Sequence, residues 1–106
     1  MPDDDKDRLF DSDVIEESRE DLKEPDMFRV MLHNDHYTTM EFVIEVLRAV
    51  FHKPLLEATK IMLDVHRKGL GIVGTYTFDI AKTKTEQVLR MAKDREFPLQ
   101  CTFEQA

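Results

Sequence analysis

The stretch 33–42 reads His33-Asn34-Asp35-His36-Tyr37-Thr38-Thr39-Met40-Glu41-Phe42. An alternating apolar run before it predicts a strand over 27–33, and apolar residues at three- and four-residue spacing after it predict a helix over 39–52. Thr38 and Glu41 match a capping box, in which the threonine side chain accepts from the backbone of Glu41 and the glutamate reaches back. The connection between strand and helix is therefore far more polar than chain reversal requires.

Outward from this stretch, the sequence predicts two more helices and two more strands. Pro54 fits the first turn of a second helix, and Gly69 supplies its left-handed end. Residues 70–76 predict a second strand, and Thr77 is a candidate cap for a third helix that ends before Pro98. The predicted inward positions are Ala58, Ile61, Met62 and Val65, then Ile80, Ala81, Lys84, Val88, Met91 and Ala92, then Leu99, Cys101 and Phe103.

This order, β-α-α-β-α-β, predicts one small α+β domain over 27–106. We expect a three-stranded, mainly antiparallel sheet packed against three helices. Residues 1–26 differ, because they hold twelve acidic and four basic side chains and few apolar ones. Such a composition predicts a disordered, flexible acidic N-terminal extension. It would serve as a solubilising tail or as a tethered segment that engages a partner.

The net charge of −7 disfavours a general nucleic-acid binder or a binder of anionic membranes. No apolar run of membrane-spanning length and no signal-peptide pattern is visible in the sequence. The single Cys101 rules out an internal disulfide and fits a reducing compartment. We therefore expect a monomeric cytoplasmic protein without a membrane or nucleic-acid partner.

Two catalytic hypotheses find limited support in the residues. Cys101 alternates with Leu99 and Phe103, a pattern typical of a buried and inert cysteine. No tight metal-ligand spacing joins His33, His36, His52 and His66. We expect no cofactor and no metal, and a small metal- or Cys-dependent hydrolase using His36, His66 and Cys101 is the alternative.

A binding hypothesis requires less of the residues. Asn34 and Asp35 offer oxygen acceptors, and a neutral His66 offers a ring nitrogen. An α-ammonium group has three donors and no acceptor, so three convergent acceptors would match it. A neighbouring apolar stripe consists of Met40, Val43, Met62 and Val65. On spacing alone this stripe is better explained as ordinary core, so the residues indicate acceptors beside an apolar stripe and no further.

The same residues resemble the ClpS family, adaptors that deliver N-degron substrates to the AAA+ protease ClpAP or its relatives. The resemblance covers about residues 25–106 without large gaps. It rests on Met27-Phe28-Arg29-Val30, Asn34-Asp35, Tyr37-Thr38, Met40-Glu41-Phe42-Val43, Ala58-Thr59, Ile61-Met62, Val65-His66, Gly69, Gly74, Ala81-x-Thr83-Lys84 and Phe97-Pro98-Leu99-Gln100-Cys101-Thr102.

The resemblance implies roles for three sets of residues. The substrate α-amino group would be held by Asn34, Asp35, His36 and His66. The first substrate side chain, normally Leu, Phe, Tyr or Trp, would be surrounded by Leu32, Thr38, Met40, Val43, Met62, Val65 and Leu99. The N-terminal domain of a ClpA-type AAA+ unfoldase would contact Tyr37, Asp79 and Lys84. Residues 1–26 would be the extension that the unfoldase engages during hand-off.

Two positions depart from the family pattern, which usually reads Asn-Asp-Asp-Tyr-Thr-Pro. Here His36 replaces the second acid and Thr39 replaces the proline. An imidazole removes a negative charge near the expected ammonium and adds a positive one when it protonates. We hypothesise weaker or more pH-sensitive binding than in typical members, and a pocket rim loosened at Thr39.

The sequence thus predicts a non-enzymatic adaptor. It would bind proteins through a free α-amino group and a bulky hydrophobic N-terminal residue, and deliver them to a Clp unfoldase-protease. The alternatives are the hydrolase described above and a generic protein-interaction module without recognition of the amino terminus.

Overall fold

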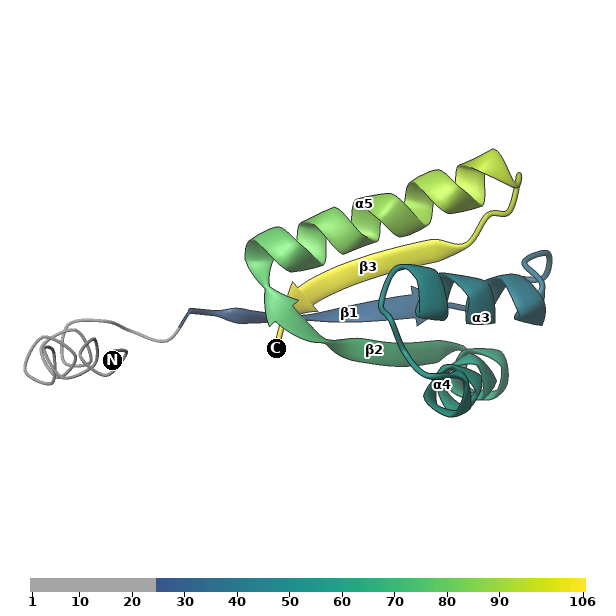
Figure 1. Cartoon of the computed structure of the whole chain (residues 1–106), viewed down its shortest axis with the longest axis horizontal. Helices are drawn as coiled ribbons and strands as arrows, with labels where there is room; N and C mark the ends of the chain where they lie inside the picture. The colour runs from purple at the N-terminus through teal and green to yellow at the C-terminus, as the bar shows by residue number, and fades with distance from the viewer. Residues whose placement is uncertain (1–24) are drawn as a thin grey trace, which may run out of the picture.

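The computed structural model of the chain describes residues 25–106, which form three strands and three helices (Figure 1). The elements are β1 (Met27–His33), α3 (Met40–Ala49), α4 (Leu55–Lys68), β2 (Leu70–Thr77), α5 (Phe78–Asp94) and β3 (Gln100–Gln105). The predicted α+β class and the order β-α-α-β-α-β are confirmed. The predicted N-terminal extension lies outside the described residues, apart from 25 and 26.

The sheet has the order β2-β1-β3, and both neighbours of β1 are antiparallel to it. On β1, Met31 lies opposite Ile72 of β2 and Thr102 of β3. The register shifts between Val30 and Met31, which leaves Val73 without a partner across the ladder. Val73 is nevertheless buried, because it lies on the same face of β2 as the buried Gly71.

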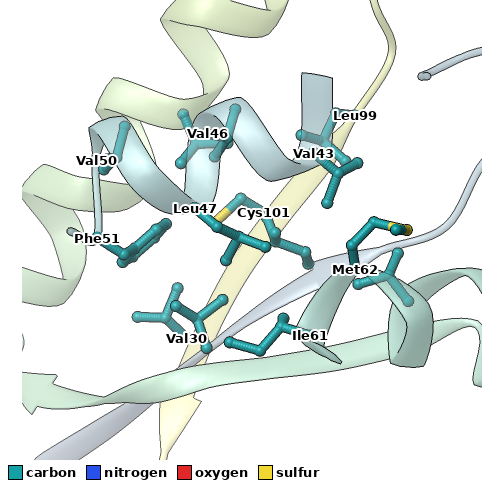
Figure 2. Packing of buried hydrophobic residues seen from close by; sticks show 14 of the residues in the cluster. Val30, Val43, Val46, Leu47, Val50, Phe51, Ile61, Met62, Leu99 and Cys101 are labelled. Carbon is teal, nitrogen blue, oxygen red and sulfur yellow. The ribbon is translucent and has the colours of Figure 1, made fainter. Parts of the chain in front are cut away.

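All three helices contribute to one hydrophobic core, together with Val30 and Leu32 of the central strand. Figure 2 shows the part of this core where Val30 lies among side chains of α3 and α4. Helix α4 packs on β2, and α5 packs on β3. Gly71 permits the first of these contacts, because a Cβ built there would lie 2.6 Å from Cγ2 of Val65. No helix within residues 25–106 is long and apolar enough to cross a membrane.

The start of α3 differs from the prediction by one residue. Thr39, not Thr38, is the cap, and its hydroxyl accepts a hydrogen bond from the backbone N–H of Phe42 at 3.1 Å. Thr38 is unavailable because its own hydroxyl donates to Asp35. The predicted Thr38 capping box is therefore wrong, and Thr39 fixes the first turn through a contact that proline could not make. At the other end of the helix pair, Gly69 adopts φ 86°, as predicted.

Helix α5 also corrects two predictions. Thr77 occupies the cap position but makes no side-chain capping bond. The buried stripe of the helix is Ala81, Thr85, Val88 and Ala92. Ile80, predicted to point inward, is 46% exposed, because this stripe follows a four-three-four spacing that leaves Ile80 at its edge.

Candidate functional site

A pocket of about 370 Å³ opens where the loop after β1 meets the first turn of α3 and the last turns of α4. Its lining combines polar and apolar side chains. The lining residues are Asn34, Asp35, His36, Thr38, Thr39, Met40, Glu41, Val43, Met62, Val65 and His66. The pocket thus brings together side chains from three segments that the sequence separates by up to 32 positions.

The carboxylate of Asp35 builds the loop. Its Oδ1 accepts hydrogen bonds from the backbone N–H groups of Tyr37 and Thr38, both at 2.7 Å. Its Oδ2 accepts one from the Thr38 hydroxyl, also at 2.7 Å. A short acidic side chain that bonds the backbone two and three residues ahead stabilises a tight turn. Asp35 therefore holds the loop in the shape that presents its neighbours to the pocket.

These contacts also change the acidity of Asp35. Burial alone would raise the pKa of this carboxyl group. The hydrogen bonds from Thr38 and from the backbone of Tyr37, helped by the nearby charge of His36, outweigh burial and lower the pKa. Asp35 is consequently ionised under all mild conditions and keeps a fixed negative charge at the pocket.

The floor of the pocket is apolar. Val43 from α3 and Met62 and Val65 from α4 are buried, and Met40 stands at the side, 46% exposed. Figure 2 shows Val43 and Met62 at the same end of the core cluster, on facing helices. Methionine is unbranched and polarisable, so this floor can adapt to side chains of different shapes.

Polar groups remain exposed at the rim. Asn34, His36 and His66 line the pocket with exposed side chains. The backbone N–H of Asn34 donates to the carbonyl of Gly69 at 3.1 Å, which ties the loop to the end of α4. This bond brings Asn34 close to the last turn of the helix, where His66 lies. An amide oxygen and an imidazole nitrogen beside an apolar floor can accept hydrogen bonds from one bound cation.

The structure sorts the seven predicted pocket residues into two groups. Thr38, Met40, Val43, Met62 and Val65 line the pocket. Leu32 and Leu99 lie in the core at 0% and 3% exposure, outside the lining. Figure 2 shows Leu99 beside Val43.

Thr39, expected at the pocket rim, lines the pocket. Glu41 lines it as well and was not among the predicted site residues. The signal for Glu41 was its place in the first turn of α3, directly beside Met40.

The three predicted unfoldase-contact residues differ in their surroundings. Tyr37 is 76% exposed on the loop, and Asp79 is exposed in the first turn of α5. Lys84 is partly buried, and its ammonium group donates to the carbonyl of Val50 at 2.7 Å. The same group lies 5.6 Å from the centre of the Phe51 ring. Lys84 therefore has a structural task inside the domain.

The hydrolase alternative finds little support in this arrangement. Cys101 is buried away from the pocket, and its thiol donates to the Thr85 hydroxyl at 3.8 Å. Burial raises the pKa of the thiol to about 11, against the smaller opposite effect of the Thr85 hydrogen bond. A thiol of this kind is protonated at neutral pH and is a poor nucleophile.

Of the four histidines of the described chain, His36 and His66 line the pocket, whereas His33 and His52 lie outside its lining. His33 pairs with Thr102 at 2.7 Å between Nε2 and Oγ1. Across residues 25–106, no group of three or more His, Cys, Asp or Glu side chains is placed to hold a metal ion.

Comparison with known proteins gives one consistent family. The family model described as "ATP-dependent Clp protease adaptor protein ClpS" matches residues 23–102. The protein of that name from Syntrophus aciditrophicus is 54% identical over 96 residues, which cover 91% of this chain and 90% of the relative. The one from Acetivibrio thermocellus is 56% identical over 91 residues, which cover 86% of this chain and 92% of the relative.

A solved structure gives the same answer. The structure of Agrobacterium tumefaciens ClpS2 bound to L-phenylalaninamide matches with a TM-score of 0.76 at 38% sequence identity. The match covers 78% of this chain and 100% of that one. This chain therefore belongs to the ClpS family of adaptor proteins of the ATP-dependent Clp protease.

Proposed function

We propose that this adaptor binds proteins that carry a free α-amino group and a bulky hydrophobic first residue: Leu, Phe, Tyr or Trp. It hands them to a Clp AAA+ unfoldase-protease and breaks no bond itself. The observation that carries this proposal is the pocket itself. Exposed acceptors on Asn34 and His66 stand over a floor formed by Val43, Met62 and Val65.

The α-ammonium group of the substrate would donate to Asn34 and His66. Each hydrogen bond to a charged group contributes roughly 1.5–3 kcal/mol. Asp35 adds a fixed negative charge nearby, although its oxygens already accept three bonds from within the loop. We therefore assign direct contact to Asn34 and His66, and to Asp35 the shape of the loop and a favourable electrostatic field.

The first side chain of the substrate would fill the apolar floor. Burying a Leu or Phe side chain contributes about 1.5–3 kcal/mol. After the costs of association, these contacts are consistent with micromolar or tighter affinity, about −8 kcal/mol at 1 μM. The related ClpS2 structure holds L-phenylalaninamide, which combines a free α-amino group with a benzyl side chain, and this supports the same chemistry here.

The partner for hand-off would be the N-terminal domain of a ClpA-type unfoldase. Tyr37 and Asp79 are exposed and free to make direct contact with it. Lys84 would act in part through the fold, because its ammonium group already bonds Val50. Residues 1–26 would be the extension that the unfoldase engages.

A pair of peptides tests the substrate proposal. A fluorescent peptide beginning with Phe and its N-acetylated twin are titrated against the full chain, each with and without a chelator. Binding of the free amine only, unaffected by the chelator, is the expected result. Equal binding of the acetylated twin would indicate a generic interaction module, and loss of binding with the chelator would indicate a metal-dependent site.

A further inference from the structure

The rim of the pocket carries four titratable side chains from three segments. Asp35 and His36 come from the loop, Glu41 comes from the first turn of α3, and His66 comes from the last turn of α4. Glu41, His36 and His66 are exposed. The rim therefore combines two carboxylates with two imidazoles.

His36 stands apart from the bonds that build the loop. Within the described chain, those bonds run from Tyr37 and Thr38 to Asp35, and from Phe42 to Thr39. The imidazole of His36 contributes to none of them. Burial raises the pKa of Asp35, and the hydrogen bonds from Thr38 and Tyr37 lower it. The nearby charge of His36 makes a smaller contribution that lowers it further. His36 is thus a pocket-lining side chain whose ring nitrogens are available to a bound molecule.

The geometry of the proposed complex places the second substrate residue at this rim. The apolar floor takes the first side chain, and Asn34 and His66 take the α-ammonium group. The chain must then leave through the open side of the pocket, past the exposed side chains of the rim. The half-buried Asp35 and the exposed Glu41 repel a carboxylate, whereas the exposed His36 can donate a hydrogen bond to it.

We propose that His36 is a specificity-determining residue that lets this adaptor accept substrates with Asp or Glu in the second position. The inference rests on the proposed function, since it concerns the residue that follows the bound amino terminus. A neutral imidazole donates one N–H to the substrate carboxylate, and an imidazolium adds an opposite charge. An acid at position 36 would place a third carboxylate on the rim beside Asp35 and Glu41.

The test uses two matched peptides that differ only in charge at the second residue, Phe-Glu and Phe-Gln. The measured quantity is the ratio of their dissociation constants at each pH. The proposed contact of His66 with the α-ammonium group is common to both peptides, so its contribution largely cancels in this ratio. The glutamate carboxyl stays ionised throughout the range from pH 6 to 8, since its ordinary pKa is about 4.3.

For the wild-type chain, Phe-Glu should bind at least as tightly as Phe-Gln at pH 6. His36→Asp should weaken Phe-Glu relative to Phe-Gln by about five-fold at pH 6, the size expected for exchanging one exposed charge for its opposite. His36→Gln should give a shift of about two-fold in the same direction. Salt at 0.5 M should reduce all these differences.

His52→Asp is the matched control. His52 is exposed in the connection after α3, at the opposite end of that helix from the pocket, and its φ of 56° suits aspartate. This variant makes the same charge change and should leave the ratio at its wild-type value. A ratio that is the same for wild type, His36→Asp and His36→Gln would overturn the assignment of His36 while leaving amino-terminus binding intact. Failure of every free-amine Phe peptide to bind would overturn the proposed function together with it.

Discussion

The loop 34–38 and the start of α5 both carry charged residues that we propose to act toward another protein. In the loop, Asp35 is bonded internally, and its neighbours Asn34 and His36 are exposed. At the start of α5 there is again one internally bonded charged residue and one exposed residue, but here the bonded residue is positively charged. Lys84 is bonded to the end of α3, and Asp79 is exposed. Each region therefore pairs one charged residue that builds the fold with others that are open to a ligand.

This comparison teaches how to interpret substitutions in the two regions. Replacing the internally bonded residue should change the free energy of unfolding as well as binding. Replacing the exposed residue should change binding alone. A loss of binding alone does not tell whether the replaced residue builds the fold or contacts the ligand. The following predictions therefore consider stability together with binding.

The largest effect is expected at Asn34. Asn34→Ala removes an acceptor for the α-ammonium group, and a hydrogen bond to a charged group contributes roughly 1.5–3 kcal/mol, which corresponds to about ten- to a hundred-fold in affinity. The free energy of unfolding should stay within about 0.5 kcal/mol of wild type, since only the backbone of Asn34 is bonded internally. Peptide titration and urea unfolding measure the two quantities. Gln87→Ala, an exposed change on α5, serves as the control and should alter neither.

The next effect is expected at Asp35. Asp35→Ala removes the acceptor of three hydrogen bonds and should lower the free energy of unfolding by about 1–2 kcal/mol. Binding of the Phe peptide should weaken as well, because the loop loses its shape. Urea unfolding of wild type and of Asp35→Ala measures the change in the free energy of unfolding. Unchanged stability would show that the turn does not depend on this carboxylate.

The stability contributed by Asp35 should depend on pH in a defined direction. Its pKa is lowered in the folded state, so the folded chain binds this proton less readily than the unfolded chain does. The difference between wild type and Asp35→Ala should therefore be complete above about pH 5 and disappear as the pH falls through the lowered pKa. A difference that grows toward acid pH would contradict this sign.

A smaller effect is expected at Lys84. Lys84→Met keeps the length of the side chain but removes the bond to Val50 and the cation–π contact with Phe51. A cation at a helix C-terminus contributes about 0.3–1 kcal/mol and a cation–π pair about 0.5–1 kcal/mol, so a loss of about 1 kcal/mol is expected. Thermal unfolding measures it. A variant as stable as wild type that still fails to bind the unfoldase domain would assign Lys84 to the surface alone.

The smallest effect on stability is expected at Asp79. Asp79→Asn removes a favourable charge from the first turn of α5 and should change the free energy of unfolding by no more than about 0.5 kcal/mol. Binding to the unfoldase domain should nevertheless weaken. Pull-down with the isolated N-terminal domain, alongside Lys84→Met, sharpens the comparison. A large loss of stability at Asp79 would remove the distinction between the two residues.

The sequence was a good guide wherever a single residue type determines the local geometry. The strand 27–33 was predicted with its observed bounds, and Gly69 was predicted at the left-handed end of α4. The alternation of side chains along a strand and the left-handed conformation of a glycine follow from backbone geometry alone. Packing against neighbouring elements therefore does not change either of them. The cap of α3 was predicted one residue too early, at Thr38 in place of Thr39. Asp35 takes the Thr38 hydroxyl, and that competition is visible only in three dimensions.

The site was predicted in part for a similar reason. Residue types and the family resemblance indicated the rim and most of the floor. They did not show that Leu32 and Leu99 lie behind the floor, because burial in a core and lining of a pocket give the same apolar pattern. Nor could they show that Lys84 bonds Val50, since the two residues are 34 positions apart in sequence.

The central place of β1 in the sheet has a mechanical consequence. The chain enters the domain directly through this strand, which is flanked on both sides by antiparallel partners (Figure 1). The hydrogen bonds of both ladders lie perpendicular to the strand, so a pull along its axis from Met27 would load them together in shear. The carbonyl of Met27 is itself held by the N–H of Ala106 at 2.9 Å. A motor that pulled on the amino-terminal end of this chain would meet the most resistant part of the domain first.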